Sequence, residues 1–162
     1  MPVNLSPNSH PALIALIGFD LDILDLAESC GCIVEGYFDQ EDRGRIRHLG
    51  DDLEGKKYTG NTVFGLQSPA IRQKIWPNYA DKMTSLISPT AHVSSSASVN
   101  IGATVHHGAI IFPEAEIGKA VQIHAGVFVH HESIIGDFST LSPKALILGR
   151  VKIGHGVFVG AG

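Results

Sequence analysis

A hydrophobic period of six residues runs through the second half of the chain. From Ile87 to Val159 every sixth position is a branched aliphatic residue: Ile87, Val93, Val99, Val105, Ile111, Ile117, Ile123, Val129, Ile135, Leu141, Ile147, Ile153 and Val159. Four residues after each of the first twelve stands Ala, Ser or Val. A fixed short period of this kind is typical of a hexapeptide-repeat parallel β-helix.

The spacing also predicts how the repeats stack. Three hexapeptides close a triangular coil of eighteen residues, and residues eighteen apart then lie one strand spacing, ~4.8 Å, from each other. Three internal ladders are expected. The first contains Ile87, Val105, Ile123, Leu141 and Val159, the second Val93, Ile111, Val129 and Ile147, and the third Val99, Ile117, Ile135 and Ile153. An α-helix is excluded because a period of six keeps no constant face at 3.6 residues per turn. Alternating strands are excluded by the frequency of Gly and Pro.

The first half of the chain predicts a small Rossmann-like βαβ domain of mixed α/β class over residues 11–86, after a disordered lead-in over residues 1–10. Residues 12–17 predict a buried parallel strand and residues 33–38 a second one. Between them, Leu21–Ser29 predicts an amphipathic helix whose apolar face contains Leu21, Leu24 and Ala27, with Ile23 and Leu26 beside them. A βαβ unit of this kind binds ligands beyond the carboxyl ends of its strands.

The remaining connections are less regular. Residues 40–60 are charged and rich in Gly, and predict a long loop. Residues 62–66 predict a third strand, and Ser68 with Pro69 predicts the start of a helix that Pro77 stops. Residues 82–86 predict a short strand into the coils. Residues 87–162 then form the β-helix of about four coils, and because the chain ends just inside a fifth coil, we expect a truncated C-terminal end.

Composition narrows the classes of function. The net charge of −4 and the absence of a basic patch with interleaved aromatics give no argument for nucleic acid. The apolar run Ala12–Ile17 is too short to span a membrane and lacks the charged start of a secretory signal, so we expect a cytoplasmic protein. Cys30 and Cys32 are too close for a favourable disulfide and too few for a zinc site, and we expect reduced thiols.

Seven of the nine histidines fall within the repeats. His106 and His124 are eighteen residues apart and should stack in adjacent coils. His131 and Glu132 should project from an exposed corner, where a carboxylate raises the basicity of a neighbouring histidine and suits it to act as a general base. A solvated ion pair on a turn is the alternative. Zinc would need three imidazoles from neighbouring coils; the five-residue spacing used by β-helix carbonic anhydrases is missing, so we expect no metal.

Several motifs resemble a known family. HHE at 130–132, IIGDFS at 134–139, SPKA at 142–145 and the closing VFVGAG resemble the bacterial sugar acetyltransferases of the left-handed β-helix superfamily. Within it, the chain is similar to the branch that N-acetylates nucleotide-linked 4-amino sugars or O-acetylates sialic acids. The resemblance covers nearly the whole chain and alone implies the left hand, because the usual crossover rule gives the opposite one.

The resemblance implies an acetyl-CoA-dependent enzyme that acts by direct attack of a sugar amine or hydroxyl on the thioester. It implies that His131 is the general base and Glu132 its carboxylate partner. It also implies a homotrimer with the active site between neighbouring subunits. The short apolar run already led us to expect no membrane partner. The acetyl-CoA groove would include Thr140, Gly149 and Ala161, and the nucleotide-linked sugar would meet Gly18, Asp39, Gln40, Gln67 and His124.

One stretch departs from the family pattern. The loop after the first strand reads Gly18-Phe19-Asp20-Leu21, which is shorter and has one glycine where the family has a Gly-rich loop with a histidine. Asp20 and Asp22 would repel a pyrophosphate at the helix N-terminus. These departures argue against nucleotide binding. The alternative function is a catalytically silent trimeric scaffold or binding module that has lost its ligand sites.

Overall fold

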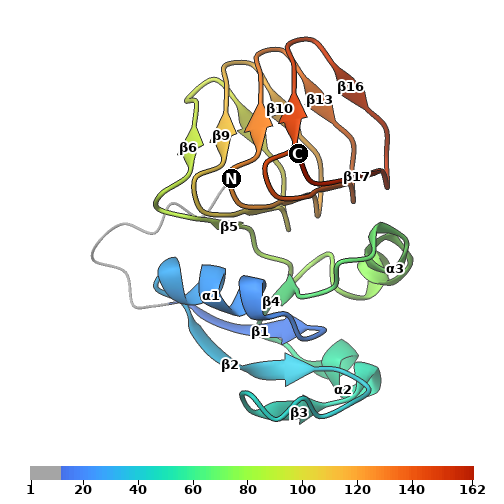
Figure 1. The fold of residues 1–162 in the computed structure, drawn as a ribbon. Coiled ribbons are helices and arrows are strands. Elements are labelled where there is room, and N and C mark those ends of the chain that lie inside the picture. The colour runs from blue at the N-terminus through green and yellow to red at the C-terminus, as the bar shows by residue number, and fades with distance from the viewer. Residues whose placement is uncertain (1–11) are drawn as a thin grey trace.

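The computed structural model describes residues 12–162, and the predicted disordered lead-in therefore lies outside the described residues. Figure 1 shows two parts: a sheet region (residues 12–85) and a stack of triangular coils (residues 86–162). The helices α1 (Leu21–Ser29) and α3 (Pro69–Ile75) both lie beside the coils.

The sheet region is built on four parallel strands in the order β3-β2-β1-β4. Strand β1 (Leu13–Ile17) is central, and β2 (Ile33–Phe38) and β4 (Asn61–Phe64) flank it. Four of the five side chains of β1 are buried, as expected for a strand covered on both faces. The predicted strand–helix–strand succession over residues 12–38 is confirmed.

The buried face of α1 agrees with the predicted one except at Leu21. Ile23, Leu26 and Ala27 are fully buried, whereas Leu21 is 53% exposed. Asp20 caps the helix with Oδ1, which accepts hydrogen bonds from the backbone N–H groups of Asp22 and Ile23. The helix therefore begins with its first side chain turned to solvent.

The predicted loop over residues 40–60 is wrong. It contains the short edge strand β3 (His48–Gly50) and the helix α2 (Asp52–Lys57). A capping box starts this helix, because Asp51 accepts from the N–H of Glu54 while the Glu54 carboxylate accepts from the N–H of Asp51.

The helix α3 begins at Pro69 and ends at Ile75, followed by the 3₁₀ turn η1 (Trp76–Asn78). The predicted strand over residues 82–86 is reduced to one bridge between Thr62 and Met83, after which the chain enters the first coil at β5 (Leu86–Ile87).

Each strand of the coils has two residues and pairs in parallel with strands eighteen residues away. The first sheet contains β5, β8 (Thr104–Val105), β11 (Gln122–Ile123), β14 (Thr140–Leu141) and β17 (Phe158–Val159). The second contains β6 (His92–Val93), β9 (Ile110–Ile111), β12 (Phe128–Val129) and β15 (Leu146–Ile147). The third contains β7 (Ser98–Val99), β10 (Glu116–Ile117), β13 (Ile134–Ile135) and β16 (Lys152–Ile153).

The aliphatic residues of the six-residue period fill the interior of the coils. Those of the middle coils, from Val105 to Leu141, are at most 1% exposed, and each buried side chain stabilises the fold by about 1.5–3 kcal/mol. The predicted eighteen-residue coil and its three ladders are confirmed.

The third residue after each interior aliphatic has a positive φ from Gly102 to Gly156. Four of these ten positions are Gly, and six are not: Glu114, Ala120, Glu132, Phe138, Lys144 and Arg150. A side chain in this left-handed conformation costs about 1 kcal/mol or more, which the rest of the coil must offset.

Candidate active site

His131 and Glu132 lie at the turn after β12, on an exposed corner of the coils. Nδ1 of His131 is 2.7 Å from Oε2 of Glu132, and the two side chains are 39% and 41% exposed. Because an ionised carboxylate can only accept, Nδ1 of the neutral imidazole carries the proton and Nε2 keeps the lone pair. The hydrogen bond from His131, together with Arg150 at 3.0 Å, holds the pKa of Glu132 below its usual range.

Gly149 lies against this histidine from the next coil. A Cβ at Gly149 would stand 2.9 Å from both Cε1 and Nε2 of His131. Because glycine has no side chain, there is room beside Nε2 of His131, the nitrogen that holds the lone pair. The structure thus brings together three of the predicted site residues, His131, Glu132 and Gly149.

The neighbouring face of the second sheet is apolar. His130 packs against His131 with ring centroids 4.5 Å apart, and stacks on Phe112 at 4.6 Å. Leu146 on β15 and Leu148, directly after that strand, continue the surface at 58% and 62% exposure. We call Ile110, Phe112, Phe128, Leu146 and Leu148 the apolar stripe.

His124 lies at a different corner, after β11, where the coils meet the sheet region. Its Nε2 is 3.1 Å from Oε1 of Gln67, and Nε2 of Gln67 donates to Oδ2 of Asp20 at 2.7 Å. His106 stacks on His124 as predicted, with centroids 5.1 Å apart. Burial lowers the pKa of His106 to about 4 and lowers that of His124 as well.

Arg72, on α3, joins the sheet region to the coils in the same place. Its guanidinium donates to the carbonyl oxygens of Leu66 and Gln67 on one side and of Phe138 on the other. It also donates to Oγ1 of Thr140 at 2.9 Å. No carboxylate of residues 12–162 pairs with it, and burial lowers its pKa to about 10.

The contacts of Arg72 change the interpretation of Thr140 and of Arg72 itself. Thr140, which the resemblance places in the acetyl-CoA groove, is fully buried beneath Arg72. Arg72 itself was not singled out from the sequence, because an arginine in an amphipathic helix gives no signal that it will be buried.

Gly18 and Asp39 meet at the carboxyl ends of β1 and β2. Gly18 has φ +78°, and its N–H donates to the carbonyl of Phe38. Oδ2 of Asp39 accepts from the N–H of Phe19 at 3.3 Å. Gln40 follows, exposed to solvent. Beside them is an open recess of about 380 Å³ lined by Phe19, Asp20, Leu21, Asp22, Arg43 and Arg45.

The predicted site residues thus fall into separate groups. One group is the corner of His131, and the other runs from Asp39 and Gly18 to Gln67 and His124. His124 and His131 belong to successive corners, with strand β12 between them. Ala161 is exposed in the last turn, after β17.

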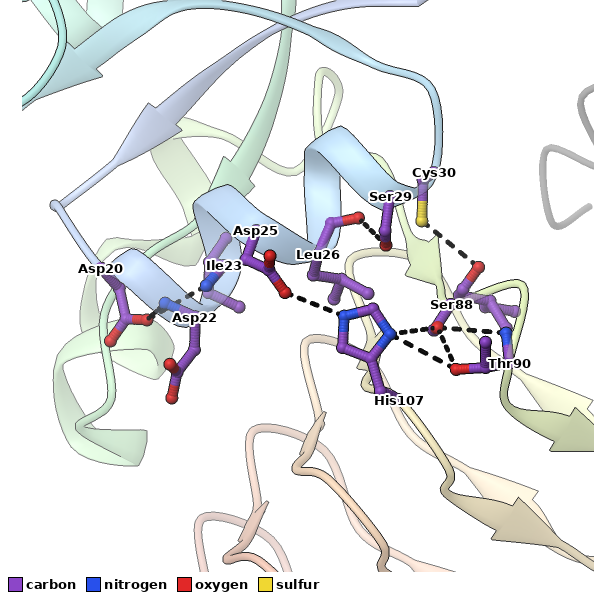
Figure 2. A network of polar contacts seen from close by, with 11 residues as sticks. Asp20, Asp22, Ile23, Asp25, Leu26, Ser29, Cys30, Ser88, Thr90 and His107 are labelled. Atoms are coloured by element: carbon purple, nitrogen blue, oxygen red, sulfur yellow. Dashed lines mark hydrogen bonds and ion pairs between the residues drawn. The ribbon is translucent and has the colours of Figure 1, made fainter.

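A second polar tie joins α1 to the coils, and Figure 2 shows its contacts. Nε2 of His107 is 2.9 Å from Oδ2 of Asp25, and Nδ1 is 2.8 Å from Oγ of Ser88. The order resembles a Ser-His-Asp triad. However, Ser88 is 2% exposed and its Oγ accepts from the N–H of Thr90, so these residues hold the two parts together.

Another recess, of about 650 Å³, lies elsewhere, at the first coil and the edge of β1, and includes none of the predicted site residues. Cys30 and Cys32 border it as free thiols, and burial raises the pKa of both. Within residues 12–162, no three His, Cys, Asp or Glu side chains gather in a group that could hold a metal. In the same range no helix is long and apolar enough to cross a membrane.

Comparison with known proteins gives likeness in structure. No protein-family model and no curated protein matches the sequence. Among solved structures, PerB from Caulobacter crescentus, in complex with CoA and GDP-perosamine, is 22% identical with a TM-score of 0.80, over 92% of this chain and 86% of that one. PerB is a perosamine N-acetyltransferase.

Two further structures agree. The acetyltransferase domain of PglB from Neisseria gonorrhoeae FA1090, in complex with acetyl coenzyme A, is 21% identical with a TM-score of 0.78, over 94% and 90% of the two chains. WeeI from Acinetobacter baumannii AYE is 15% identical with a TM-score of 0.78, over 93% and 79%. The likeness to acetyltransferases read from the motifs is confirmed for the fold, and the chain has the fold of bacterial sugar acetyltransferases such as PerB.

Proposed function

We propose that this protein transfers the acetyl group of acetyl-CoA to an amine of a nucleotide-linked sugar. The observation that carries the proposal is the corner of His131, where a histidine oriented by a carboxylate keeps one nitrogen open beside Gly149. The shared fold with proteins that hold CoA, acetyl-CoA and GDP-perosamine supports it. The left hand of the coils is part of the same proposal.

In this proposal Nε2 of His131 accepts the proton of the acceptor amine as its nitrogen attacks the thioester carbonyl carbon. The C–N bond forms, the C–S bond breaks, and the thiolate of CoA leaves and takes up a proton. Glu132 keeps Nδ1 protonated and stabilises the imidazolium while it exists, which is the usual role of a carboxylate behind a catalytic histidine.

The acceptor would lie along the carboxyl edge of the sheet, where βαβ units bind their ligands. The sheet region would then be a Rossmann-like nucleotide-binding domain, with Asp39 and Gln40 at its end. The sequence suggested that Asp20 would repel a pyrophosphate. However, both oxygens of this carboxylate accept hydrogen bonds, from the start of α1 and from Gln67, which weakens that objection.

The two groups of site residues lie at different corners, so we propose that the active site forms between copies in a homotrimer. The apolar stripe supports this arrangement because it borders His131 and presents several large apolar side chains to solvent. A second copy that covers the stripe would bring its own carboxyl edge towards His131, with acetyl-CoA in the groove beside Gly149 and Ala161.

The test is an acetylation assay with acetyl-CoA and a panel of GDP- and UDP-linked 4-amino sugars, followed by release of the CoA thiol. Turnover with one of these sugars, and its loss in His131→Asn, would support the proposal. The control is His155→Asn, an exposed histidine in the coils. No turnover with any sugar would favour the silent scaffold.

A further inference from the structure

Gln67 lies between two side chains that reach it from different parts of the fold. Asp20 follows β1, Gln67 follows β4, and His124 follows β11 in the coils. The distances are 2.7 Å from Nε2 of Gln67 to Oδ2 of Asp20, and 3.1 Å from Oε1 of Gln67 to Nε2 of His124. The three side chains form one continuous line of hydrogen bonds at the carboxyl edge of the sheet.

The chemistry of Asp20 sets the direction of every hydrogen bond in this line. Its Oδ1 accepts from two backbone N–H groups of α1, and Oδ2 faces Gln67. A carboxylate can only accept, so the amide of Gln67 must turn its NH₂ group towards Asp20 and its oxygen towards His124. Nε2 of His124 must therefore carry a proton.

The ring of His124 is also kept neutral. Burial is the main cause that lowers its pKa, and the buried charge of Arg72 lowers it further. Asp22 and Asp20 raise the pKa but do not offset this. A neutral ring with a proton on Nε2 has its lone pair on Nδ1. No side chain or backbone group of residues 12–162 donates to that atom.

His106 shows that the arrangement is specific to His124. Within residues 12–162, the only buried side-chain polar atoms without a partner are Nε2 of His106 and Oγ1 of Thr104. Nδ1 of His124 has no partner among residues 12–162 and is not one of these fully buried atoms, and His124 is 8% exposed. The two histidines stack in adjacent coils, yet only His124 has Gln67 behind it.

We infer that Asp20 and Gln67 are positioning residues that fix His124 as an acceptor, so that Nδ1 receives a hydrogen bond from a hydroxyl or amine of the acceptor sugar. The identity of this ligand rests on the proposed function, whereas the tautomer of His124 does not. The hydrogen bonds from Asp20 through Gln67 to His124 thus favour a sugar whose group facing Nδ1 is a hydrogen-bond donor. A sugar with only an acceptor at that position would bind less well.

The decisive variant is Asp20→Asn. Its side-chain oxygen still caps α1, so its NH₂ group must face Gln67. Gln67 then turns over and donates to Nε2 of His124, and the proton moves to Nδ1. Long-range ¹H–¹⁵N spectra of the free protein are expected to show Nε2–H in the wild type and Nδ1–H in this variant. Asp22→Asn removes the same charge from the same turn and should leave Nε2–H unchanged.

Acceptor kinetics test the second half of the inference. With GDP-perosamine, or whichever sugar of the panel turns over, Asp20→Asn should raise KM about tenfold with little change in kcat, since one hydrogen bond of roughly 1–1.5 kcal/mol is lost.

Each result decides one part. Nδ1–H in the wild type, or an unchanged tautomer in Asp20→Asn, would overturn the line of hydrogen bonds. An inverted tautomer with an unchanged KM would overturn the contact with the sugar. If no sugar turns over, the proposed function fails, and the spectra still decide the role of Asp20 and Gln67.

Discussion

His106 and His124 lie one coil apart with their rings almost parallel, 5.1 Å between centroids and 6° between planes. Both are buried at the seam between the coils and the sheet region, at 3% and 8% exposure. Neither ring takes up a proton there at little cost. Burial disfavours the charge on both rings, a charge on His124 disfavours it further on His106, and Arg72 disfavours it further on His124.

This pair predicts a loss of stability in mild acid. The unfolded chain binds a proton on His106 near pH 6.5, whereas the folded chain binds it only near pH 4. The free energy of unfolding should therefore fall as the pH drops from about 6.5 towards 4, by up to roughly 3 kcal/mol from His106. His106→Leu should flatten this dependence in urea unfolding measured between pH 7.5 and pH 4.5. Equal slopes for wild type and variant would contradict the assignment.

Glu132 is expected to matter through His131. Glu132→Gln keeps an oxygen near Nδ1 but loses the charge that stabilises the imidazolium, so kcat/KM should fall by about 10- to 100-fold. Arg150→Gln is the matched control, because it removes the other partner of the same carboxylate oxygen and should change kcat/KM less than threefold. Similar losses in both variants would show that the whole ion-pair network, rather than the His131 contact, supports activity.

Gly149→Ala places a methyl group 2.9 Å from Nε2 of His131. The imidazole ring of His131 must rotate away, and we expect at least a tenfold loss of kcat/KM. The melting temperature should be nearly unchanged, because the His131 side chain is at the surface and can move. At Gly154 a Cβ would meet only Val157, at 3.8 Å, so Gly154→Ala should behave as wild type. An active Gly149→Ala enzyme would mean that Nε2 does not work in the observed rotamer.

Arg72→Met should destabilise the protein by about 3–5 kcal/mol, because several buried carbonyl oxygens and Thr140 lose their donor together. The measurement is urea unfolding at pH 7.5. Arg47→Met, at an exposed arginine, should change the free energy of unfolding by less than about 0.5 kcal/mol. A small effect at Arg72 would show that water replaces the guanidinium at the seam.

Leu146→Asp tests whether the apolar stripe is an interface between copies. A charge in the stripe should lower the mass measured by light scattering from that of a trimer to that of a monomer. The control is Leu53→Asp, which changes an equally exposed leucine (60%) on α2 and should leave the mass unchanged. A wild-type monomer, or a trimer that survives Leu146→Asp, would contradict the proposed assembly.

The coils could be predicted almost residue by residue because one local rule repeats. At every sixth position an aliphatic side chain points inward, and three such periods make one coil of eighteen residues. This spacing of eighteen sets both the strand pairs and the stacking of His106 on His124. The corner of His131 and Glu132 could be predicted for the same reason, since it depends only on neighbours in sequence.

The seam could not be predicted, because it depends on contacts between distant segments. Asp20 read from sequence as a charge that would repel a phosphate, whereas it caps α1 and binds Gln67. Arg72 lies about fifty residues or more from the groups that it joins in the coils. The helix α2 is a different case, because its D-x-x-E capping box is visible in the sequence at Asp51 and Glu54. The segment was nevertheless predicted as a loop because of its high charge.

The strict count of six also limits how this chain can change in length. Deleting one residue from a turn such as that at Gly126 would rotate the following strand, and the next aliphatic side chain would face water. Removing a whole coil would keep every later residue in phase and would only shorten the stack by one layer. The coil regions of related proteins should therefore differ in length by multiples of eighteen residues, or by loops inserted at a corner of one coil.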